Sequence, residues 1–591
     1  MKIRLFVSFG VALLSAIAPL TAHADCSIGR ELELPVTMQG LRPVVTVQIN
    51  GRDARFVADS GAFFSSISPG SAAEYGLRLE PAPPGFSWRG IGGSVNPSIA
   101  TVKELSLSGV KLQNMQFLVG GSEVGGQVGL LGQNVLGIAD VEYDLAHGAI
   151  RLMKTKGCAR DANLAYWSTG KNVSELEIES KADAHSHTRG TVILNGAKIR
   201  AVFDTGSPTT ILTTSAAARA GIKPDSPGVQ PAGYSSGLGR QTIRTWTGPF
   251  QSLKIGDNEE IQKIRLRFGD IGDDFDMLIG ADFFLSHRVY VANGVQKMFF
   301  TYNGGPVFDL TNRSAPPIAD TPKPVMAGAG GSPASADDYA RLGEALASRQ
   351  QFDQALADLD KAVALAPADS RYVYQRALIH GALHQPLKAQ ADLDTALKLD
   401  PANRDALLRR TEIRLVRGER VGAREDADAL DKALAPSADV RLQLAAIYQR
   451  LDDADRAIAQ YDLWIAAHPA DHRLPEAYNG RCWMRALAGR ELDKALPDCD
   501  RALHLAPHTA SFLDSRGLAR LRSGDFAKAI GDYDEALKIN PNLAWSLYGR
   551  GLAKRHQGDR AGGDADIAAA LKLQPGLAGE AKRRGIDPGD S

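Results

Sequence analysis

The sequence predicts a multidomain protein with an all-β front half and an all-α back half. Residues 30 to 308 consist of short alternating apolar runs broken by Gly, Asn and Pro, which is typical of strands and turns. From residue 337 the chain is rich in Ala, Leu, Asp and Arg with helical spacing, and prolines recur 33 to 38 residues apart. Residues 309–336, rich in Pro, Ala, Gly and Ser, are predicted to form a flexible linker between the halves.

Length and composition limit the class of protein. The chain has 591 residues, of which 44% are hydrophobic and 23% charged, so several ordinary globular domains are expected. The net charge is zero, which argues against a nucleic-acid partner or a polybasic membrane-surface protein. Past the N-terminal region no apolar run reaches the ~18 residues of a membrane span.

The N-terminal segment 1–24 has the pattern of a secretory signal peptide. Lys2 and Arg4 precede an apolar stretch, and Ala22-His23-Ala24 supplies small residues for cleavage near Ala24. Asp25 stands where a lipoprotein site would need a small residue. We therefore expect an exported protein of the periplasm.

Four cysteines remain in the predicted mature chain, and an even number in an oxidising compartment favours disulfides. Cys26 opens the first β region and Cys158 closes it, whereas Cys482 and Cys499 lie on neighbouring predicted helices. Buried free thiols are the alternative for each pair. The cysteines and histidines do not have metal-ligand spacing, so neither a metal nor a cofactor is predicted.

The front half contains an internal repeat. Residues 50–77 align without gaps on residues 195–222, and nine of 28 positions are identical. Within this alignment Asp59-Ser60-Gly61 matches Asp204-Thr205-Gly206, each triplet following an apolar run. An acid at the end of a buried strand is costly unless a partner holds it. The simpler alternative is an Asp that caps a turn at each site.

Two further landmarks recur in the same order. Each copy has a glycine-rich hairpin tip and, further on, two apolar residues before a glycine that opens a short helix, over 133–136 and 281–284. The repeat therefore predicts two lobes of one fold, at 25–160 and 175–308. The tips are Gly90-Ile91-Gly92-Gly93 and Gly237-Leu238-Gly239-Arg240, and the later landmarks are Leu130-Leu131-Gly132 and Leu278-Ile279-Gly280.

This order of motifs resembles the retropepsin-like aspartic proteases, including their exported bacterial relatives. The resemblance implies that Asp59 and Asp204 meet on a two-fold axis and share one proton. One acid would activate a water for attack on a peptide carbonyl, and the other would donate to the oxyanion. It further implies that Ser60 and Thr205 hydrogen-bond across the lobes, that Gly61 and Gly206 allow close approach, and that both hairpin tips act as flaps.

The sequence also departs from the viral pattern. An acid two residues past the motif glycine and an Arg after the second landmark are both missing, because Phe63, Pro208, Gln133 and Ala281 stand at these positions. Without that acid and that Arg, the ion pair that steadies the viral-type interface cannot form here. A covalent tether between lobes lowers that requirement. Two alternatives follow from these departures: one lobe is degenerate, or each lobe pairs with its equivalent in another chain.

The back half resembles tetratricopeptide repeats, about seven of them over 337–576, followed by a tail at 577–591. Cys482 and Cys499 fall on the two helices of the fifth repeat. Such arrays bind peptides or partner proteins. Arginines recur on one side of the first helices, as a solvated face with i,i+4 pairs or as a groove for acidic peptides; they are Arg376, Arg410, Arg481, Arg516 and Arg550.

The leading hypothesis is an exported aspartic endopeptidase whose repeat array recruits substrate or partner proteins. The alternative is a non-catalytic peptide-binding scaffold with degenerate lobes. A third possibility is that the lobes only process the protein itself at the linker.

Overall fold

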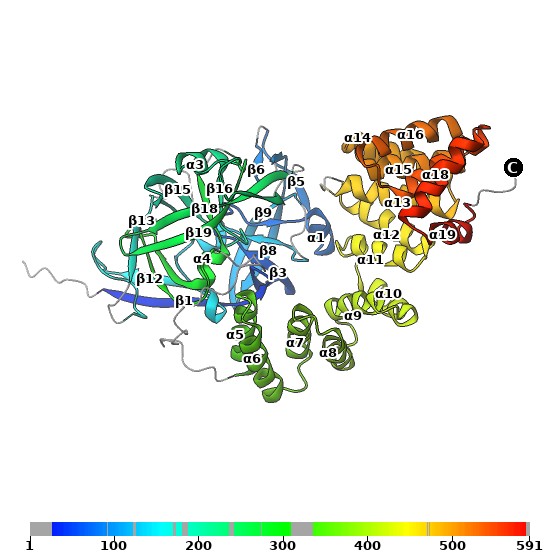
Figure 1. The fold of residues 1–591 in the computed structure, drawn as a ribbon. Coiled ribbons are helices and arrows are strands. Elements are labelled where there is room, and N and C mark those ends of the chain that lie inside the picture. The colour runs from blue at the N-terminus through cyan, green and yellow to red at the C-terminus, as the bar shows by residue number, and fades with distance from the viewer. Residues whose placement is uncertain are drawn as a thin grey trace, which may run out of the picture.

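The structure is a computed structural model, and it confirms a β-rich front half followed by a helical array (Figure 1). It describes residues 26–84, 86–91, 93–121, 126–168, 173–179, 187–235, 242–272, 275–308, 335–469, 471 and 473–586. The predicted signal peptide, the linker core and the second hairpin tip at 237–239 lie outside these residues, as does Gly92. No described helix is both long and apolar enough to cross a membrane.

The first lobe is built mainly from strands, because its apolar residues alternate along each run. A short helix, α1 (Pro69–Glu74), follows the Asp59-Ser60-Gly61 triplet. The side chain of Ser68 caps this helix by accepting from the backbone N–H of Ser71. The strands are β1 (Ser27–Gln39), β2 (Arg42–Ile49), β3 (Arg52–Ala58), β4 (Ser66–Ile67), β5 (Leu79–Pro81), β6 (Trp88–Gly90), β7 (Gly93–Val95), β8 (Ser98–Leu107), β9 (Val110–Val119), β10 (Gly129–Leu131), β11 (Asp140–Asp144) and β12 (Ala149–Lys156), with the helices α2 (Gln133–Leu136) and η1 (Leu145–His147).

The second lobe repeats this plan. Its sheet runs in the order β14-β15-β20-β16-β19-β18-β17. Both lobes share one main apolar core. The strands are β13 (Ser174–Glu177), β14 (Arg189–Leu194), β15 (Ala197–Phe203), β16 (Ile211–Thr213), β17 (Gln230–Ser235), β18 (Ile243–Ile255), β19 (Glu259–Gly269), β20 (Met277–Ile279), β21 (His287–Ala292) and β22 (Lys297–Tyr302), with the helices α3 (Thr214–Arg219) and α4 (Ala281–Ser286).

Strands of the two lobes join in one sheet, in the order β13-β22-β21-β11-β12-β1. The junction is the antiparallel pair β11 and β21, which aligns Val141 with Val291 and Tyr143 with Val289. Backbone hydrogen bonds thus cross the lobe boundary, and the two lobes pair within one chain.

The back half forms seven helix pairs and a final short helix within the described residues, which agrees with the predicted repeat number. The segment set apart as a tail contains this last helix, α19, which buries Leu577 and Ala581 against the final repeat. The helices are α5 (Ala336–Ser348), α6 (Phe352–Leu365), α7 (Ser370–Ala382), α8 (Pro386–Leu399), α9 (Arg404–Val416), α10 (Arg420–Ala433), α11 (Arg441–Arg450), α12 (Ala454–Ala467), α13 (Leu474–Ala488), α14 (Leu492–Leu505), α15 (Ala510–Arg522), α16 (Phe526–Ile539), α17 (Ala544–His556), α18 (Arg560–Leu573) and α19 (Leu577–Arg583).

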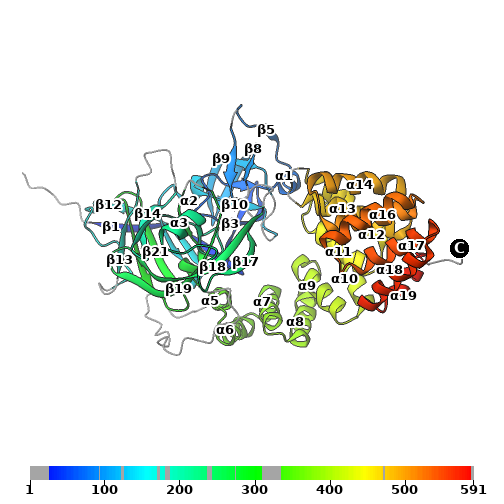
Figure 2. The same ribbon diagram turned by 45° about the horizontal axis from the view of Figure 1, so that its top comes forward.

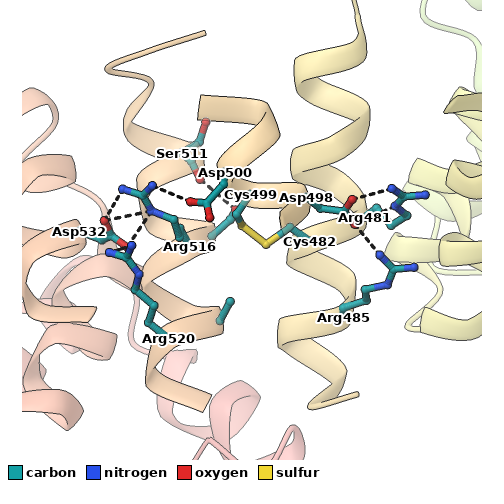
Figure 3. Close-up of a disulfide and its surroundings, with 12 residues drawn as sticks. Arg481, Cys482, Arg485, Asp498, Cys499, Asp500, Ser511, Arg516, Arg520 and Asp532 are labelled. Atoms are coloured by element: carbon teal, nitrogen blue, oxygen red, sulfur yellow. Dashed lines mark hydrogen bonds and ion pairs between the residues drawn. A yellow bond between two sulfur atoms is a disulfide. The ribbon is translucent and has the colours of Figure 1, made fainter. Parts of the chain in front are cut away.

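The recurring arginines of the array are paired with aspartates on neighbouring helices. Arg516, for example, bonds Asp532 of its own repeat and Asp500 of the preceding one (Figure 3). The same double contact recurs at the other four positions. Both expected interpretations were therefore wrong: the partners lie on other helices rather than at i+4, and these guanidinium groups already hold two carboxylates each.

Both cysteine pairs form disulfides. Cys26 is bonded to Cys158 across the ends of the first lobe, and Cys482 to Cys499 between α13 and α14 (Figure 3). Within the described residues there is no free cysteine.

The array curves back toward the β-rich half (Figure 2) and contacts the first lobe at the three places described next. Helix α5 packs along β1, and Ser348 donates to the carbonyl of Gly40. Further along, Asp405 on α9 pairs with Arg55 at 3.1 Å. The carbonyl of Ser437 and the ring of His468 lie next to Gly70 on α1.

Glu344 is a titratable group at the first of these contacts. Its Oε2 accepts from the backbone N–H of Met38 at 3.1 Å, and its Oε1 accepts from Gln375 on α7. Burial raises the pKa of Glu344 to about 8, although these hydrogen bonds and the charges of Arg341 and Arg371 act in the opposite direction.

We expect the array contact to weaken with rising pH. A folded-state pKa above the ordinary 4.5 means that the folded protein binds this proton more tightly, so stability is lost as pH rises from about 4.5 through about 8. In Glu344→Gln this loss should disappear. Scanning calorimetry between pH 5 and 9 measures it, with the exposed Glu425→Gln as control; parallel Tm curves for wild type and Glu344→Gln would contradict the prediction.

Candidate active site

The two acids of the repeated triplets stand at the ends of equivalent buried strands. β3 leads into Asp59 and pairs in parallel with β10, and the backbone N–H of Asp59 donates to Leu131 at 2.9 Å. In the second lobe β15 and β20 hold Asp204 in the same way, through a 2.8 Å bond to Ile279. The second landmark of each lobe thus provides the strand that fixes the acid.

The glycine of that landmark is needed because the loop after the acid crosses directly over it. A Cβ on Gly132 would lie 2.7 Å from the backbone of Phe64, and one on Gly280 would lie 2.6 Å from Thr209. Neither distance leaves room for a side chain. Glycine at these two positions therefore lets the loop after each acid pack directly against the landmark.

Two polar pairs that the sequence analysis missed fix the same loops. Ser65 donates through its backbone N–H to Asn134 at 2.7 Å, and Thr210 makes the equivalent 2.8 Å bond to Asp282. Ser65 and Thr210 are matched in the repeat alignment, and Asn134 and Asp282 each stand two residues after the landmark glycine. Comparison of the two copies at these positions would have found them.

The middle residues of the triplets bond the lobes to each other reciprocally. The backbone N–H of Ser60 donates to Thr205 Oγ1 at 3.0 Å, and that of Thr205 donates to Ser60 Oγ at 2.9 Å. Each hydroxyl in turn donates across the boundary, Ser60 to the carbonyl of Phe203 and Thr205 to that of Ala58. Four buried hydrogen bonds therefore set the distance between the two strand ends.

The carboxyl groups of Asp59 and Asp204 lie together at the lobe boundary, where each stands against the motif glycine of the other lobe; Asp59 is buried and Asp204 is partly buried. Burial raises both pKa values, and the charge of Asp204 raises that of Asp59 further, well above its ordinary 3.8. Two carboxylates in contact cannot both be ionised, so the pair holds one proton. Asp204 Oδ1 accepts from the backbone N–H groups of Gly206 and Ser207, which stabilises a charge on Asp204.

Gly61 and Gly206 make this contact possible. A Cβ on Gly61 would overlap the carboxyl of Asp204, and one on Gly206 would overlap that of Asp59. Below the pair, the fully buried Tyr143 lies next to Ser60 and Gln133, and burial raises its pKa strongly. Gln133 also donates to the carbonyl of Ser60 at 2.8 Å, so it supports the first triplet from below.

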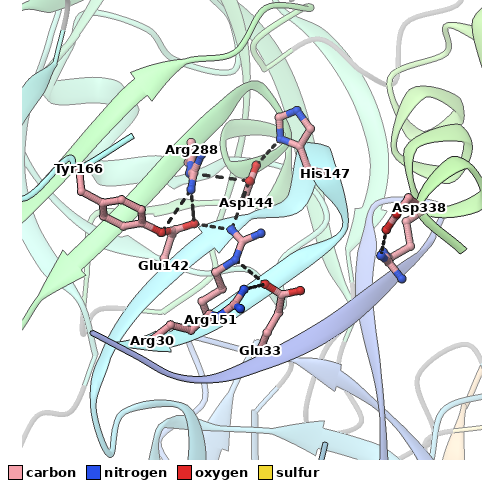
Figure 4. Close-up of polar contacts among 10 residues, drawn as sticks. Arg30, Glu33, Glu142, Asp144, His147, Arg151, Tyr166, Arg288 and Asp338 are labelled. Carbon is pink, nitrogen blue, oxygen red and sulfur yellow. Dashed lines mark hydrogen bonds and ion pairs between the residues drawn. The ribbon is translucent and has the colours of Figure 1, made fainter. Parts of the chain in front are cut away.

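A buried ionic network takes the place of the missing viral-type ion pair (Figure 4). Glu142 on β11 is completely buried and accepts from Arg288 on β21 of the other lobe at 2.8 Å. Arg151 also bonds Glu142. Burial opposes ionisation of the neighbouring Asp144, but His147, Arg288 and Arg151 outweigh it and lower its pKa. Together with the shared sheet, this network holds the two lobes.

The first hairpin tip reaches over the second lobe. β6 and β7 pair around it, and Ile91 packs against an apolar cluster beside the second acid. A cavity of about 520 Å³ opens nearby between Thr213 and Trp246. The described arms of the second hairpin are β17 and β18, which pair antiparallel. The apolar cluster consists of Val202, Ile211, Ile271 and Leu278, with Ile243 and Phe275 packed on it.

Comparison with known proteins agrees with this geometry. Residues 45–137 match the model of the gag-polyprotein putative aspartyl protease family, and residues 190–283 match that of the aspartyl protease family. Residues 339–369 match the tetratricopeptide repeat model and residues 517–558 a TPR repeat model. The chain therefore carries two retropepsin-like aspartyl protease domains. They are followed by tetratricopeptide repeats, and this combination supports a protease with a protein-interaction module.

Solved structures are similar over the array. A tetratricopeptide repeat protein from Parabacteroides merdae is 16% identical, with a TM-score of 0.32 over 42% of this chain and 98% of its own. YrrB, described as a TPR protein with an unusual peptide-binding site, is 17% identical, with a TM-score of 0.23 over 38% and 97%. Yeast Tom70 is 20% identical, with a TM-score of 0.25 over 43% and 54%. A search of curated proteins finds no match.

Proposed function

We propose that this protein is an aspartic endopeptidase that acts after export, in the periplasm. The observation that carries the proposal is the close approach of the Asp59 and Asp204 carboxyl groups, assembled from two lobes of one chain. Asp204 as carboxylate would take a proton from a water, and Asp59 as acid would donate to the carbonyl oxygen under attack. The two disulfides favour an oxidising compartment.

The reaction would cleave a peptide bond by direct attack of water. The water oxygen bonds to the carbonyl carbon, its proton passes to the charged acid, and the protonated acid protonates the carbonyl oxygen. In the collapse of the tetrahedral species the acid that took the water proton protonates the amine nitrogen, the other acid takes back a hydroxyl proton, and the C–N bond breaks. The flaps would cover the peptide and supply backbone hydrogen bonds to it.

We propose that the later repeats of the array recruit substrate or partner proteins. Helices α5 and α9 already contact the first lobe. Farther along, the partly exposed rings of Trp483 and Trp545 lie 5.9 Å apart on α13 and α17. Such aromatic side chains are the usual anchors of protein interfaces.

Peptide hydrolysis tests the proposal. The mature protein should cut members of a peptide library and be inhibited by a statine-type transition-state mimic, whereas N-terminal sequencing of the protein over time follows self-cleavage near 309–336. Peptides that bind and stay intact at every pH between about 3 and 8 would instead establish the scaffold alternative.

A further inference from the structure

The two sides of the acid pair are chemically different, although the lobes repeat one plan. Phe63 and Pro208 hold the same place in the repeat, four residues past each acid. Phe63 contacts Phe64 and His187 at ring distances of 4.5 and 6.4 Å. Phe64 contacts Phe86, which stands just before the first flap strand, at 6.5 Å. Phe63 and Phe86 are each 36% exposed, so this aromatic cluster can accept a ligand.

Arg42 occupies the equivalent place on the other side. Arg42 and His187 are 145 residues apart, as Phe63 and Pro208 are, and β2 pairs with β3 in the same register in which β14 pairs with β15. From this repeat we infer that Arg42 lies on the side of Pro208, as His187 lies beside Phe63. Arg42 is half-buried as a residue, and its buried Nε has no hydrogen-bond partner. Among the described residues burial alone shifts its pKa, and no neighbouring charge contributes.

An arginine in this setting lacks a counterion. Burial lowers the pKa of Arg42, but a guanidinium stays charged in proteins. Arg288 and Arg481, which are also largely buried, each hold carboxylates. Pro208 offers Arg42 no side-chain acceptor. A carboxylate from a ligand would form charge-assisted hydrogen bonds with the fork of donors that Arg42 presents.

We propose that the active site binds its peptide substrate in one direction along the chain. An aromatic or bulky apolar side chain lies at the cluster of Phe63, Phe64, Phe86 and His187, and an Asp or Glu side chain lies at Arg42 on the opposite side of the scissile bond. This inference rests on the proposed peptidase function. It assigns Arg42 as a residue that determines specificity.

Cleavage profiling of the full mature chain tests the inference. Mass spectrometry of a digested peptide library should show acids enriched at one position and aromatic residues on the other side of the cut. For a peptide pair that differs only by Glu or Gln at the acidic position, wild type should favour Glu about tenfold in kcat/KM. Arg42→Gln should reduce this ratio to about one, and Arg42→Lys should restore most of it.

Two further variants separate the ends of the site. Phe63→Ala should lose the aromatic preference and keep the Glu-to-Gln ratio. Arg52→Gln is the matched control, because Arg52 lies on the exposed surface of the same lobe over the Tyr75 ring. A profile without acid enrichment, or an unchanged ratio in Arg42→Gln, would overturn the inference.

Binding separates this failure from that of the proposed function. Fluorescence anisotropy of labelled Glu and Gln peptides on Asp204→Asn measures the preference without cleavage. If Asp204→Asn binds the Glu peptide more tightly than the Gln peptide, if this preference needs Arg42, and if wild type cleaves neither, the charge preference is supported and the proposed peptidase function is wrong. If wild type cleaves the peptides and the Glu-to-Gln ratio of kcat/KM is unchanged in Arg42→Gln, the peptidase function is supported and the charge preference is wrong.

Discussion

Asp204→Asn is expected to lower kcat/KM for peptide cleavage by about 10²–10⁴-fold. The reaction needs one protonated and one charged carboxyl group in the pair. The amide of Asn can neither take the proton of the water nor donate a proton to the carbonyl oxygen. The fold should survive, because Asn keeps an oxygen that accepts from the N–H groups of Gly206 and Ser207. Asp59→Asn should have the same effect. The assay is hydrolysis of a library-derived fluorogenic peptide.

The sign of the stability change provides a second readout. Burial raises the pKa of Asp204, so the folded state is penalised for ionising it, and this penalty grows as pH rises above the ordinary 3.8. The neutral Asn removes it, so Tm at pH 7 should be unchanged or higher. Asp225→Asn, a change at an exposed acid of the same lobe, is the control that should stay active. Full activity in Asp204→Asn would end the proposed mechanism.

Gly206→Ala is expected to abolish activity by a different route. The added methyl group would overlap the carboxyl of Asp59, so the two acids must separate. Activity should fall at least about 10²-fold because misplaced groups lose their catalytic alignment. Overpacking should also cost on the order of 1–3 kcal/mol of stability. Gly61→Ala should act equivalently on Asp204.

Gly294→Ala is the matched control for this prediction. A Cβ on Gly294 meets no atom within 4 Å, and its backbone does not require glycine. Peptide hydrolysis and thermal unfolding of the two variants should therefore diverge clearly. Wild-type kinetics in Gly206→Ala would show that the two carboxyl groups are farther apart in solution.

The local patterns of the chain were sufficient to predict its architecture and both acids. Alternating apolar runs predicted the strands, and the spacing of the prolines predicted seven helix pairs. Asp59 and Asp204 could be found because the repeat placed the same acid after the same apolar run twice. The strand and helix patterns depend on residues a few positions apart, and the repeat needs only a comparison of the two copies, so both can be read from the sequence.

The contacts between distant segments could not be predicted. Glu142 and Arg288 are 146 residues apart, and Glu344 and Met38 are 306 apart, so neither pair leaves a periodic signal. The arginines of the array were expected either in i,i+4 pairs or in a groove for acidic peptides, but their aspartate partners lie on other helices. Tertiary packing decides these pairings, and a one-dimensional pattern does not record it.

The joining of both lobes in one chain has a consequence for how such a site can diversify. In a site built from two copies of one chain, every substitution appears twice and the site stays symmetric. Here β11 and β21 join two separately encoded halves. A change at Phe63 therefore leaves Pro208 untouched, and a change at Arg42 leaves His187 untouched. Each half can be altered for its own end of a peptide while the shared acids remain as they are.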